Sequence, residues 1–323
     1  NQQTDHNCMN CHSFRMHDPD DMLFHMRSTY GGTYVWTNGV LEKLDGKVSD
    51  AIQSLVYPYW HPSGDYVAFS TNQTKQMFHM KDKNRIEVFD MSSDVLVYDV
   101  RNHRVVTDSL LFSKQAFETF PSFSPDGKTL YFSSSVAQKM PIDYKKVKYN
   151  ICSISFDAET GRFGTQVDTL FSVEQPGKTG TFPRVSPDGK FLAFTEADYG
   201  NFTIWHKEAD LCLIDLKTKE IKSLDALNSL EAESYHAWSS NGRWLVFASR
   251  RDDGLYSRPY IAYIDEEGTP HKAFVVPQAS PDAYLDGLKS YNVPEFITGP
   301  VNLQRKAVVE MAKHGQAKKV TAQ

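Results

Sequence analysis

Hydrophobic and polar residues alternate in short runs along this chain, and one version of the pattern occurs four times, at residues 56–70, 120–133, 182–195 and 235–248. Each copy has an apolar run, a polar turn spelled Ser-Pro-Asp-Gly or close to it, and a second run with apolar residues at alternate positions. Proline fixes φ at the first corner of such a turn, Asp or Asn caps it through the side chain, and glycine takes the positive φ. Each copy therefore predicts a β-hairpin.

Further strand-like runs follow the hairpins, in pairs separated by a polar turn. The clearest pairs are residues 94–100 with 104–107, 210–216 with 220–224, and 260–265 with 272–276. Four antiparallel strands in each copy, recurring at intervals of about fifty to sixty residues, are typical of β-propeller blades and not of a helical solenoid. The chain is therefore expected to be an all-β propeller.

A fifth copy opens the chain, with residues 12–14 aligned to residues 58–60 and a different turn, Asp18-Pro19-Asp20-Asp21. Its later strands are expected at residues 22–25, 32–36 and 40–44. Residues 1–300 should thus form a single propeller. Gly299-Pro300 marks its boundary, and residues 301–323 predict a short basic helix and a frayed tail. A helix packed on the propeller edge is favoured over an arm that binds a membrane surface or a partner.

Cys8-Met9-Asn10-Cys11-His12 forms a C-x-x-C-H motif. Two thiols at this spacing can add to the two vinyl groups of one porphyrin while the adjacent imidazole binds the iron. Residues 6–12 are therefore expected to attach haem c, with thioether bonds from Cys8 and Cys11 and with His12 as the proximal iron ligand. A zinc half-site would need a second Cys/His pair, and a thioredoxin-type dithiol would need a βαβ context. Neither context is visible.

The other two cysteines, Cys152 and Cys212, each lie in an apolar strand-like run. Free cysteine behaves as a small hydrophobic residue, so both are interpreted as core residues. A disulfide between them is the alternative.

Chain direction in a blade places the connection that enters the first strand on the same face as the loop between the second and third strands. We expect the C-x-x-C-H motif to lie on that connection, so these loops should supply the sixth iron ligand. His79, in the loop expected at residues 71–85 of the next blade, is the first choice. His25 is the alternative.

Two other arrangements of the iron remain open: a methionine ligand among Met22, Met26, Met77 and Met80, or an open or water-bound sixth position. His6 and His17 flank the motif and are expected to form hydrogen bonds at the haem edge or to be solvated. The side chains of Arg27, Tyr30 and Arg85 are candidates for pairing with the haem propionates.

The Ser-Pro-Asp-Gly-Lys-x-Leu-x-Phe hairpins resemble the WD-repeat-like β-propeller of TolB-type proteins, and the resemblance covers residues 12–276. With the haem motif and the Ser-Arg-Arg-Asp-Asp-Gly run at residues 249–254, the whole chain resembles haem-binding TolB-like propeller proteins found in Bacteroidetes. The resemblance implies six blades and an extracytoplasmic setting. Only five blades are legible, so the sixth would come from the C-terminal segment, with residues 290–296 as a closing strand, from a lost N-terminal region, or from both.

Composition excludes several classes of protein. Of the 323 residues, 40% are hydrophobic and 23% charged, as in a soluble globular protein, and a net charge of −5 gives no basic field for nucleic acid. No run of 18 apolar residues occurs. The chain begins at Asn1 and not at Met, so we expect a processed or trimmed chain whose export signal or lipid anchor preceded it. Membrane association through such an anchor stays open.

The leading hypothesis from the sequence is a monohaem protein of the periplasm or cell surface, because c-type haem is attached on the outer side of the bacterial membrane. It would exchange electrons with a docked redox partner or with an outer-membrane or periplasmic complex. The alternatives are an interaction scaffold that binds a protein or glycan, with a structural or sensory haem, and a peroxidase-like haem enzyme with an open sixth position. An electron-transfer or binding protein is favoured over an enzyme, and no hydrolase motif occurs.

A charged run at residues 250–253, with Arg258 nearby, is the remaining polar cluster. A loop held by its own ion pairs is the favoured interpretation, and an anion or partner-docking site is the alternative.

Overall fold

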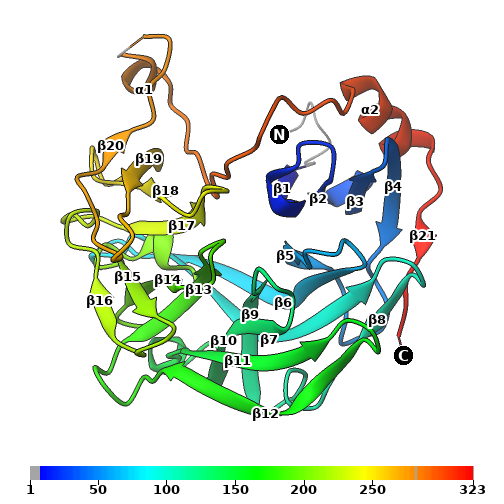
Figure 1. Ribbon diagram of the computed structural model, residues 1–323, viewed down its shortest axis with the longest axis horizontal. Coiled ribbons are helices and arrows are strands. Elements are labelled where there is room, and N and C mark those ends of the chain that lie inside the picture. The colour runs from blue at the N-terminus through cyan, green and yellow to red at the C-terminus, as the bar shows by residue number, and fades with distance from the viewer. Residues whose placement is uncertain (1–7, 281, 323) are drawn as a thin grey trace.

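The computed structural model describes residues 8–280 and 282–322, which form five β-sheets arranged as blades around a central axis (Figure 1). Blade 1 contains β1 (Cys8–Phe14), β2 (Met22–Arg27), β3 (Gly32–Thr37) and β4 (Val40–Asp45). Blade 2 contains β5 (Val56–Trp60), β6 (Tyr66–Phe78), β7 (Ile86–Asp99) and β8 (Arg104–Val106). Blade 3 contains β9 (Ala116–Phe123), β10 (Thr129–Val136), β11 (Asn150–Asp157) and β12 (Arg162–Phe171).

Blade 4 contains β13 (Thr179–Val185), β14 (Phe191–Ala197), β15 (Asp210–Asp215) and β16 (Ile221–Ser223). Blade 5 contains β17 (Glu233–Trp238), β18 (Trp244–Ser249), β19 (Arg258–Tyr263) and β20 (Phe274–Val275). Short 3₁₀ turns lie between strands: η2 (Arg15–His17), η3 (Ser28–Tyr30), η4 (Tyr144–Lys146) and η5 (Thr203–Trp205). In every blade consecutive strands pair antiparallel, so the predicted all-β propeller of four-stranded blades is confirmed.

The hairpin turns have the geometry that their spelling predicts. The glycines of the four later blades adopt φ of +66° to +81°, at Gly64, Gly127, Gly189 and Gly242. Each of these glycines donates its N–H to the carbonyl oxygen three residues earlier. In blade 3 the Ser124 hydroxyl donates to Asp126, 2.6 Å away, as expected for an Asp-capped turn.

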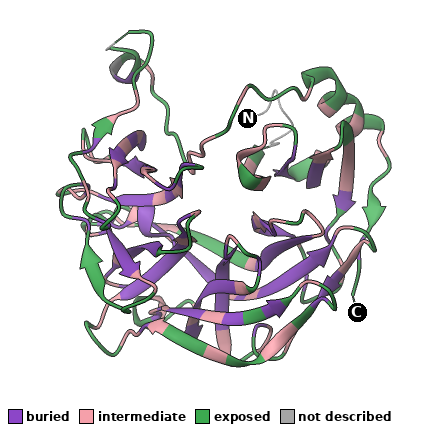
Figure 2. Ribbon diagram, in the orientation of Figure 1, coloured by how far each residue is buried: buried purple, intermediate pink, exposed green. Residues whose placement is uncertain are grey.

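The hydrophobic core lies between the blades, where buried residues follow the inner strands (Figure 2). Four large clusters each join two consecutive blades, from blade 1 with blade 2 to blade 4 with blade 5. Among the described residues, no such cluster joins blade 5 to blade 1. The sheets therefore form an open ring, and the six blades implied by the resemblance are not found in the described chain.

A strap, residues 290–298, crosses this opening from blade 5 to blade 1 (Figure 1). On blade 5, Tyr291 N–H donates to the carbonyl of Ser257 at 2.8 Å. On blade 1, Thr298 N–H donates to the carbonyl of His17 at 3.0 Å. The closing strand expected at residues 290–296 is wrong, because this segment makes isolated hydrogen bonds and no ladder.

The C-terminal segment then folds back over the outside of blade 1. A one-turn helix, α1 (Ala283–Asp286), precedes the strap, and α2 (Arg305–His314) follows it. Helix α2 packs its apolar side on blade 1 beside Met22 and Phe24, which confirms the predicted short C-terminal helix. Within the described chain, no helix is both long enough and apolar enough to span a membrane.

The frayed tail predicted after α2 is wrong, because this segment is ordered and joins two blades. Strand β21 (Lys318–Lys319) adds to β4 in parallel, and β22 (Thr321–Ala322) adds to β8 in the same way. Between them, the side chain of Val320 is buried in the core that blades 1 and 2 share. Burial of this apolar side chain and the free strand edges on both sides explain why the tail is ordered.

Candidate functional site

The innermost strand of every blade carries a β-bulge, in which two residues face one residue of the neighbouring strand. The first residue of each bulge has a φ of +51° to +59°, at Cys11, Tyr57, Phe120, Phe182 and Tyr235. A positive φ is costly for residues other than glycine, and it persists where the surrounding structure fixes it. Because all five blades share it, the left-handed backbone of Cys11 is a property of the repeat and not of the C-x-x-C-H motif.

The second residue of each bulge is of a different type in blades 1 and 5 than in the other three blades. It is proline in blades 2, 3 and 4, and it is His12 in blade 1 and His236 in blade 5. The ring of His236 is fully buried against Phe182 of blade 4, and burial lowers its pKa to about 3. His12 has no preceding blade beside it, so its side chain remains 36% exposed at the opening of the ring.

Both thiols of the motif are unpaired. Cys8 is exposed at the start of β1, and Cys11 is partly buried. Burial raises the pKa of the Cys11 thiol, opposed by a hydrogen bond from the Tyr57 backbone N–H and by the charge of Arg27. The expectation that the motif lies on the connection entering blade 1 is wrong, because Cys8 to Phe14 pair with β2 as the first strand.

A cavity of about 460 Å³ lies beside Cys11 and His12. Its walls come from the inner strands of blades 1, 2, 4 and 5, from the turn of blade 3, and from the strap. Aromatic rings dominate the wall: Tyr57, Tyr59, Trp60, Phe182, Phe202, Trp205, Tyr235 and Trp238. The volume lies within the range of small-molecule sites, and the walls are of the apolar and aromatic kind that such sites use.

Glu295, on the strap, is the acidic residue of this cavity. Its Oε2 accepts the backbone N–H of Phe14 at 3.2 Å, and its Oε1 lies 3.8 Å from Nε2 of His12. Burial raises the pKa of Glu295, and the nearby His12 opposes that rise. Sequence reasoning missed Glu295 because it had assigned this segment to a closing strand.

Arg184, on β13, also lines the cavity and was likewise missed. It directly follows the two bulge residues of blade 4, at the position where the other blades have Ser13, Tyr59, Ser122 and Ala237. A single charged residue at a position that is uncharged in the other four copies was the signal that could have found it.

The preferred sixth ligand, His79, does not lie on this cavity. Strand β6 extends to Phe78 and β7 starts at Ile86, so most of the loop expected at residues 71–85 is a long hairpin with His79 at its tip. Nε2 of His79 lies 3.3 Å from the hydroxyl of Tyr144 on η4. The ligand role of His79 remains a prediction, and this placement does not support it.

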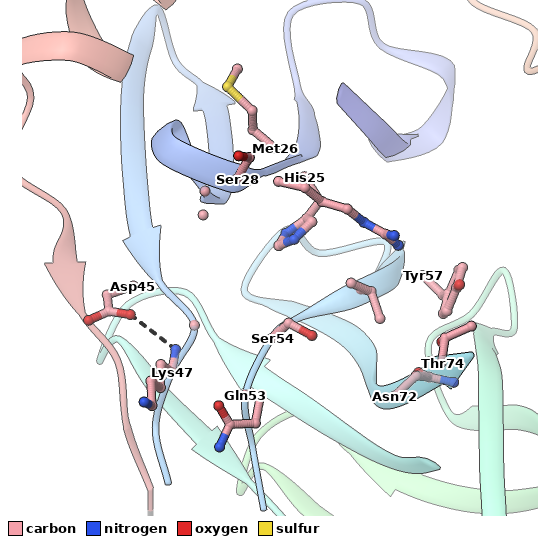
Figure 3. Close-up of a pocket in the computed structure, with 15 residues that line it drawn as sticks. His25, Met26, Ser28, Asp45, Lys47, Gln53, Ser54, Tyr57, Asn72 and Thr74 are labelled. Atoms are coloured by element: carbon pink, nitrogen blue, oxygen red, sulfur yellow. Dashed lines mark hydrogen bonds between the residues drawn. The ribbon is translucent and has the colours of Figure 1, made fainter. Parts of the chain in front are cut away.

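The alternative, His25, lines a second cavity of about 440 Å³ between blades 1 and 2 (Figure 3). The imidazole is buried, with Nδ1 3.3 Å from the Thr33 hydroxyl, and burial lowers its pKa to about 4. Arg27 and Tyr57 line both cavities and so stand between His25 and the space beside Cys11. The structure therefore does not bring His25 and His12 to one cavity.

The remaining candidate iron ligands also lie in different parts of the structure. Of the methionines, Met22 and Met26 are buried in the cluster under α2, while Met77 and Met80 are on the β6–β7 hairpin. His17 lines the first cavity, with Nδ1 3.0 Å from the carbonyl of Phe296. His6 lies outside the described residues.

The three residues expected to pair with the haem propionates lie in different places. Arg27 borders both cavities, whereas Tyr30 packs in the apolar cluster of blade 1. Arg85 lies on the β6–β7 hairpin and donates to the carbonyl of Met80 at 2.8 Å.

The charged loop of blade 5 is held by its own ion pairs. Arg258 binds Asp252 at 2.7 Å and Asp253 at 2.9 Å, and the guanidinium of Arg250 lies 4.3 Å from the ring centre of Trp205. The ion pairs of Arg258 hold the loop, as the favoured interpretation expects, while Arg250 packs on a ring of blade 4.

Cys152 and Cys212 are free and buried in two different interfaces between blades. Burial raises the pKa of Cys152 to about 11, as expected for an unreactive core thiol.

The donors beside the cavity fit a covalently attached haem. The two thiols of the motif are unpaired and three residues apart, and Cys11 and the accessible imidazole of His12 line a cavity with aromatic walls. The bulge turns this part of the strand, because bulges bend a strand and redirect its side chains. Across residues 8–280 and 282–322, no three His, Cys, Asp or Glu side chains converge as a separate metal-ion site.

Solved β-propellers are similar to this chain in fold. A protein assigned as TolB from Agrobacterium tumefaciens gives a TM-score of 0.51 at 15% identity, over 83% of this chain and 80% of its own. An oligogalacturonate lyase in complex with manganese gives 0.51 at 15% identity, over 84% of this chain and 68% of its own. TolB from Acinetobacter baumannii gives 0.46 at 15% identity, over 84% and 58%.

No protein-family model matches the chain, and no curated protein matches it. The likeness to solved structures, at 15% identity, therefore establishes the fold alone. The chain has a TolB-like β-propeller fold with five blades in its described residues.

Proposed function

We propose that this chain is an extracytoplasmic monohaem protein that carries haem c on Cys8 and Cys11 and exchanges electrons with a docked partner. The observation that carries the proposal is that Cys11 and His12 lie on the wall of a cavity of about 460 Å³ while both thiols of the motif are unpaired. The resemblance stated from the sequence adds the setting, the periplasm or cell surface.

The bound haem would supply a one-electron couple at its iron. Cys8 and Cys11 would hold the porphyrin, and His12 would bind the iron. The aromatic wall would limit access of water to the cavity, and burial of this kind is one means by which proteins tune a haem potential. Oε1 of Glu295 lies 3.8 Å from Nε2 of His12, so a charge on this carboxyl group would act on the same site.

The test is expression in a bacterial periplasm together with a haem-attachment system. The wild-type chain should gain the mass of one haem and give a c-type pyridine haemochrome, and it should be reduced and reoxidised reversibly. Cys8→Ser and Cys11→Ser together should abolish the added mass. Cys152→Ala, which changes a buried thiol far from the motif, is the matched control and should keep it.

Absence of haem from the wild-type chain, in cells that load another c-type cytochrome, would overturn the proposal. A purely high-spin ferric spectrum would instead favour the peroxidase-like alternative, because it indicates an open sixth position.

A second candidate is a propeller that binds a glycan or protein at the same cavity. The rings of Tyr57, Tyr59 and Trp205, which line the cavity, support it, since such rings bury large areas and pack on flat ligands. This candidate predicts that the haem-free Cys8→Ser/Cys11→Ser chain still binds a glycan or protein, and the first candidate does not require such binding.

A further inference from the structure

Arg184 has an unusual environment for a cation inside a propeller. The centre of its guanidinium lies 3.9 Å from the ring centre of Phe182 and 4.9 Å from that of Tyr59. Contacts of this kind are cation–π interactions, which hold the plane of an arginine side chain but neutralise no charge. The two rings therefore fix the guanidinium on the wall of the central cavity.

Most donors of this guanidinium have no hydrogen-bond partner among the described residues. Arginine has five N–H donors, and one of them is given to the adjacent carbonyl of Pro183, with Nη1 at 2.8 Å. Among the described residues, no Asp or Glu forms an ion pair with Arg184. Glu295 is the carboxylate near enough to affect its pKa, and that side chain is already engaged by Phe14 N–H and His12.

Arg184 is half-buried, an unpaired cation at a partly desolvated site is unfavourable, and burial lowers the pKa of Arg184 to about 10. A ligand that brings one negative charge with two oxygens would remove this penalty, because a carboxylate accepts two parallel N–H bonds from one guanidinium. The rings around it favour a flat, apolar body on that ligand.

We propose that Arg184 anchors a carboxylate of a flat, ring-bearing ligand in the central cavity. The carboxylate has two sources: a haem propionate, in which case the inference rests on the proposed function, or a free aromatic acid. Both use the same chemistry at Arg184. Phe182 and Tyr59 hold the guanidinium in place, and the other cavity rings contact the body of the ligand.

The first arm of the test uses the haem-free chain, made as Cys8→Ser/Cys11→Ser, with benzoate as probe. Trp60, Trp205 and Trp238 line the cavity, so their fluorescence reports occupancy. Benzoate should give a saturable change and benzyl alcohol none. Arg184→Gln should weaken benzoate binding at least tenfold, Arg184→Lys should weaken it less, and Arg162→Gln, at an exposed residue of β12, should not change it.

The second arm repeats the titration on the haem-loaded chain. Loss of benzoate binding there, with binding in the haem-free chain, identifies a propionate as the occupant, and unchanged binding identifies a free acid. Equal benzoate affinity of the haem-free chain with and without Arg184→Gln, or equal affinity of the haem-free chain for benzoate and benzyl alcohol, overturns the inference. The second comparison needs no substitution of Arg184, so it decides even if Arg184→Gln fails to fold. The haemochrome test of the proposed function is read independently of both.

Discussion

Oε1 of Glu295 lies 3.8 Å from Nε2 of His12, although one residue belongs to the strap near the end of the chain and the other to its first strand. The same carboxylate accepts the N–H of Phe14 through Oε2. This contact joins the two ends of an open ring of blades beside the motif that should hold the haem. The strap is therefore part of the candidate site and not only a connection.

Glu295→Ala should lower the free energy of unfolding by about 1–3 kcal/mol, because it leaves the N–H of Phe14 without its acceptor. It should also make the strap more sensitive to limited proteolysis, since one of its attachments to blade 1 is lost. Glu295→Gln keeps an acceptor oxygen, so its free energy of unfolding should lie between those of wild type and Glu295→Ala. Denaturant unfolding of the three chains measures the effect. Identical curves for wild type and Glu295→Ala would mean that this contact does not hold the strap.

On the proposed function, His12→Ala should keep covalent haem, because Cys8 and Cys11 would make the covalent bonds, but should lose the proximal imidazole. The haem mass should therefore remain while the ferric absorption spectrum and the reduction potential change. Intact mass and a potentiometric titration on the same sample check both parts. An unchanged spectrum would exclude His12 as an iron ligand.

His79→Ala should leave the haem spectrum unchanged, because His79 contacts Tyr144 at the tip of the β6–β7 hairpin and does not line the cavity. His17→Ala, which removes an imidazole that does line the cavity, is the informative comparison. A spectral change in His79→Ala alone would restore the ligand expected from the sequence.

Stability should depend on pH through Glu118 of β9, which is buried between blades 2 and 3. Burial, and then the charge of Asp94, raise the pKa of Glu118 to about 8, while a hydrogen bond from Ser134 opposes the rise. Below the pKa of an unfolded Glu, about 4.3, the proton is bound in both states. Between there and about pH 8, only the folded chain keeps it, so the free energy of unfolding falls as pH rises, by about 1.4 kcal/mol per unit.

Glu118→Gln should remove this part of the pH dependence. Its free energy of unfolding relative to that of wild type should therefore be more favourable at pH 8 than at pH 5. Urea unfolding at several pH values measures it. Glu174→Gln, at an exposed position, is the control and should leave the slope as in wild type. An unaltered slope in Glu118→Gln would show that another group is responsible.

The long β6–β7 hairpin should be attached to blade 4 through a buried carboxylate. Glu87 accepts the hydroxyl of Tyr199 at 2.6 Å and lies 3.0 Å from Nε2 of His206, with all three side chains buried. Tyr199→Phe should lower the free energy of unfolding by about 1.5–3 kcal/mol, because it removes a hydrogen bond to a buried charged group.

Tyr131→Phe serves as the control for Tyr199→Phe, since the Tyr131 hydroxyl makes no hydrogen bond within the described chain. The free energy of unfolding should fall less in Tyr131→Phe than in Tyr199→Phe when both are measured in the same thermal or denaturant assay. Equal losses would assign the effect to the tyrosine side chain in general and not to Glu87.

Much of the fold could be predicted from local pattern, because hairpins depend on residues close together in sequence. The period of two in each strand and the positive φ at Gly64 and its three equivalents are local properties, and both are present in the structure. The C-x-x-C-H motif is also a local feature, since Cys8, Cys11 and His12 lie within five positions. These features predicted the blades and named the thiols without any long-range information.

The tertiary structure decided what surrounds the motif. Cys11 lies in a strand and not on a connection, because β1 pairs with β2 on both sides of it, and the bulge that turns it is shared with Tyr57 and the other blades. Glu295 and Arg184 reach the cavity from the strap and from blade 4, and no local rule relates either of them to His12. The sequence by itself determined the strands, their turns and the reactive residues. Only the packing of distant segments around an open ring decided which residues share one cavity, since that depends on contacts between residues far apart in the chain.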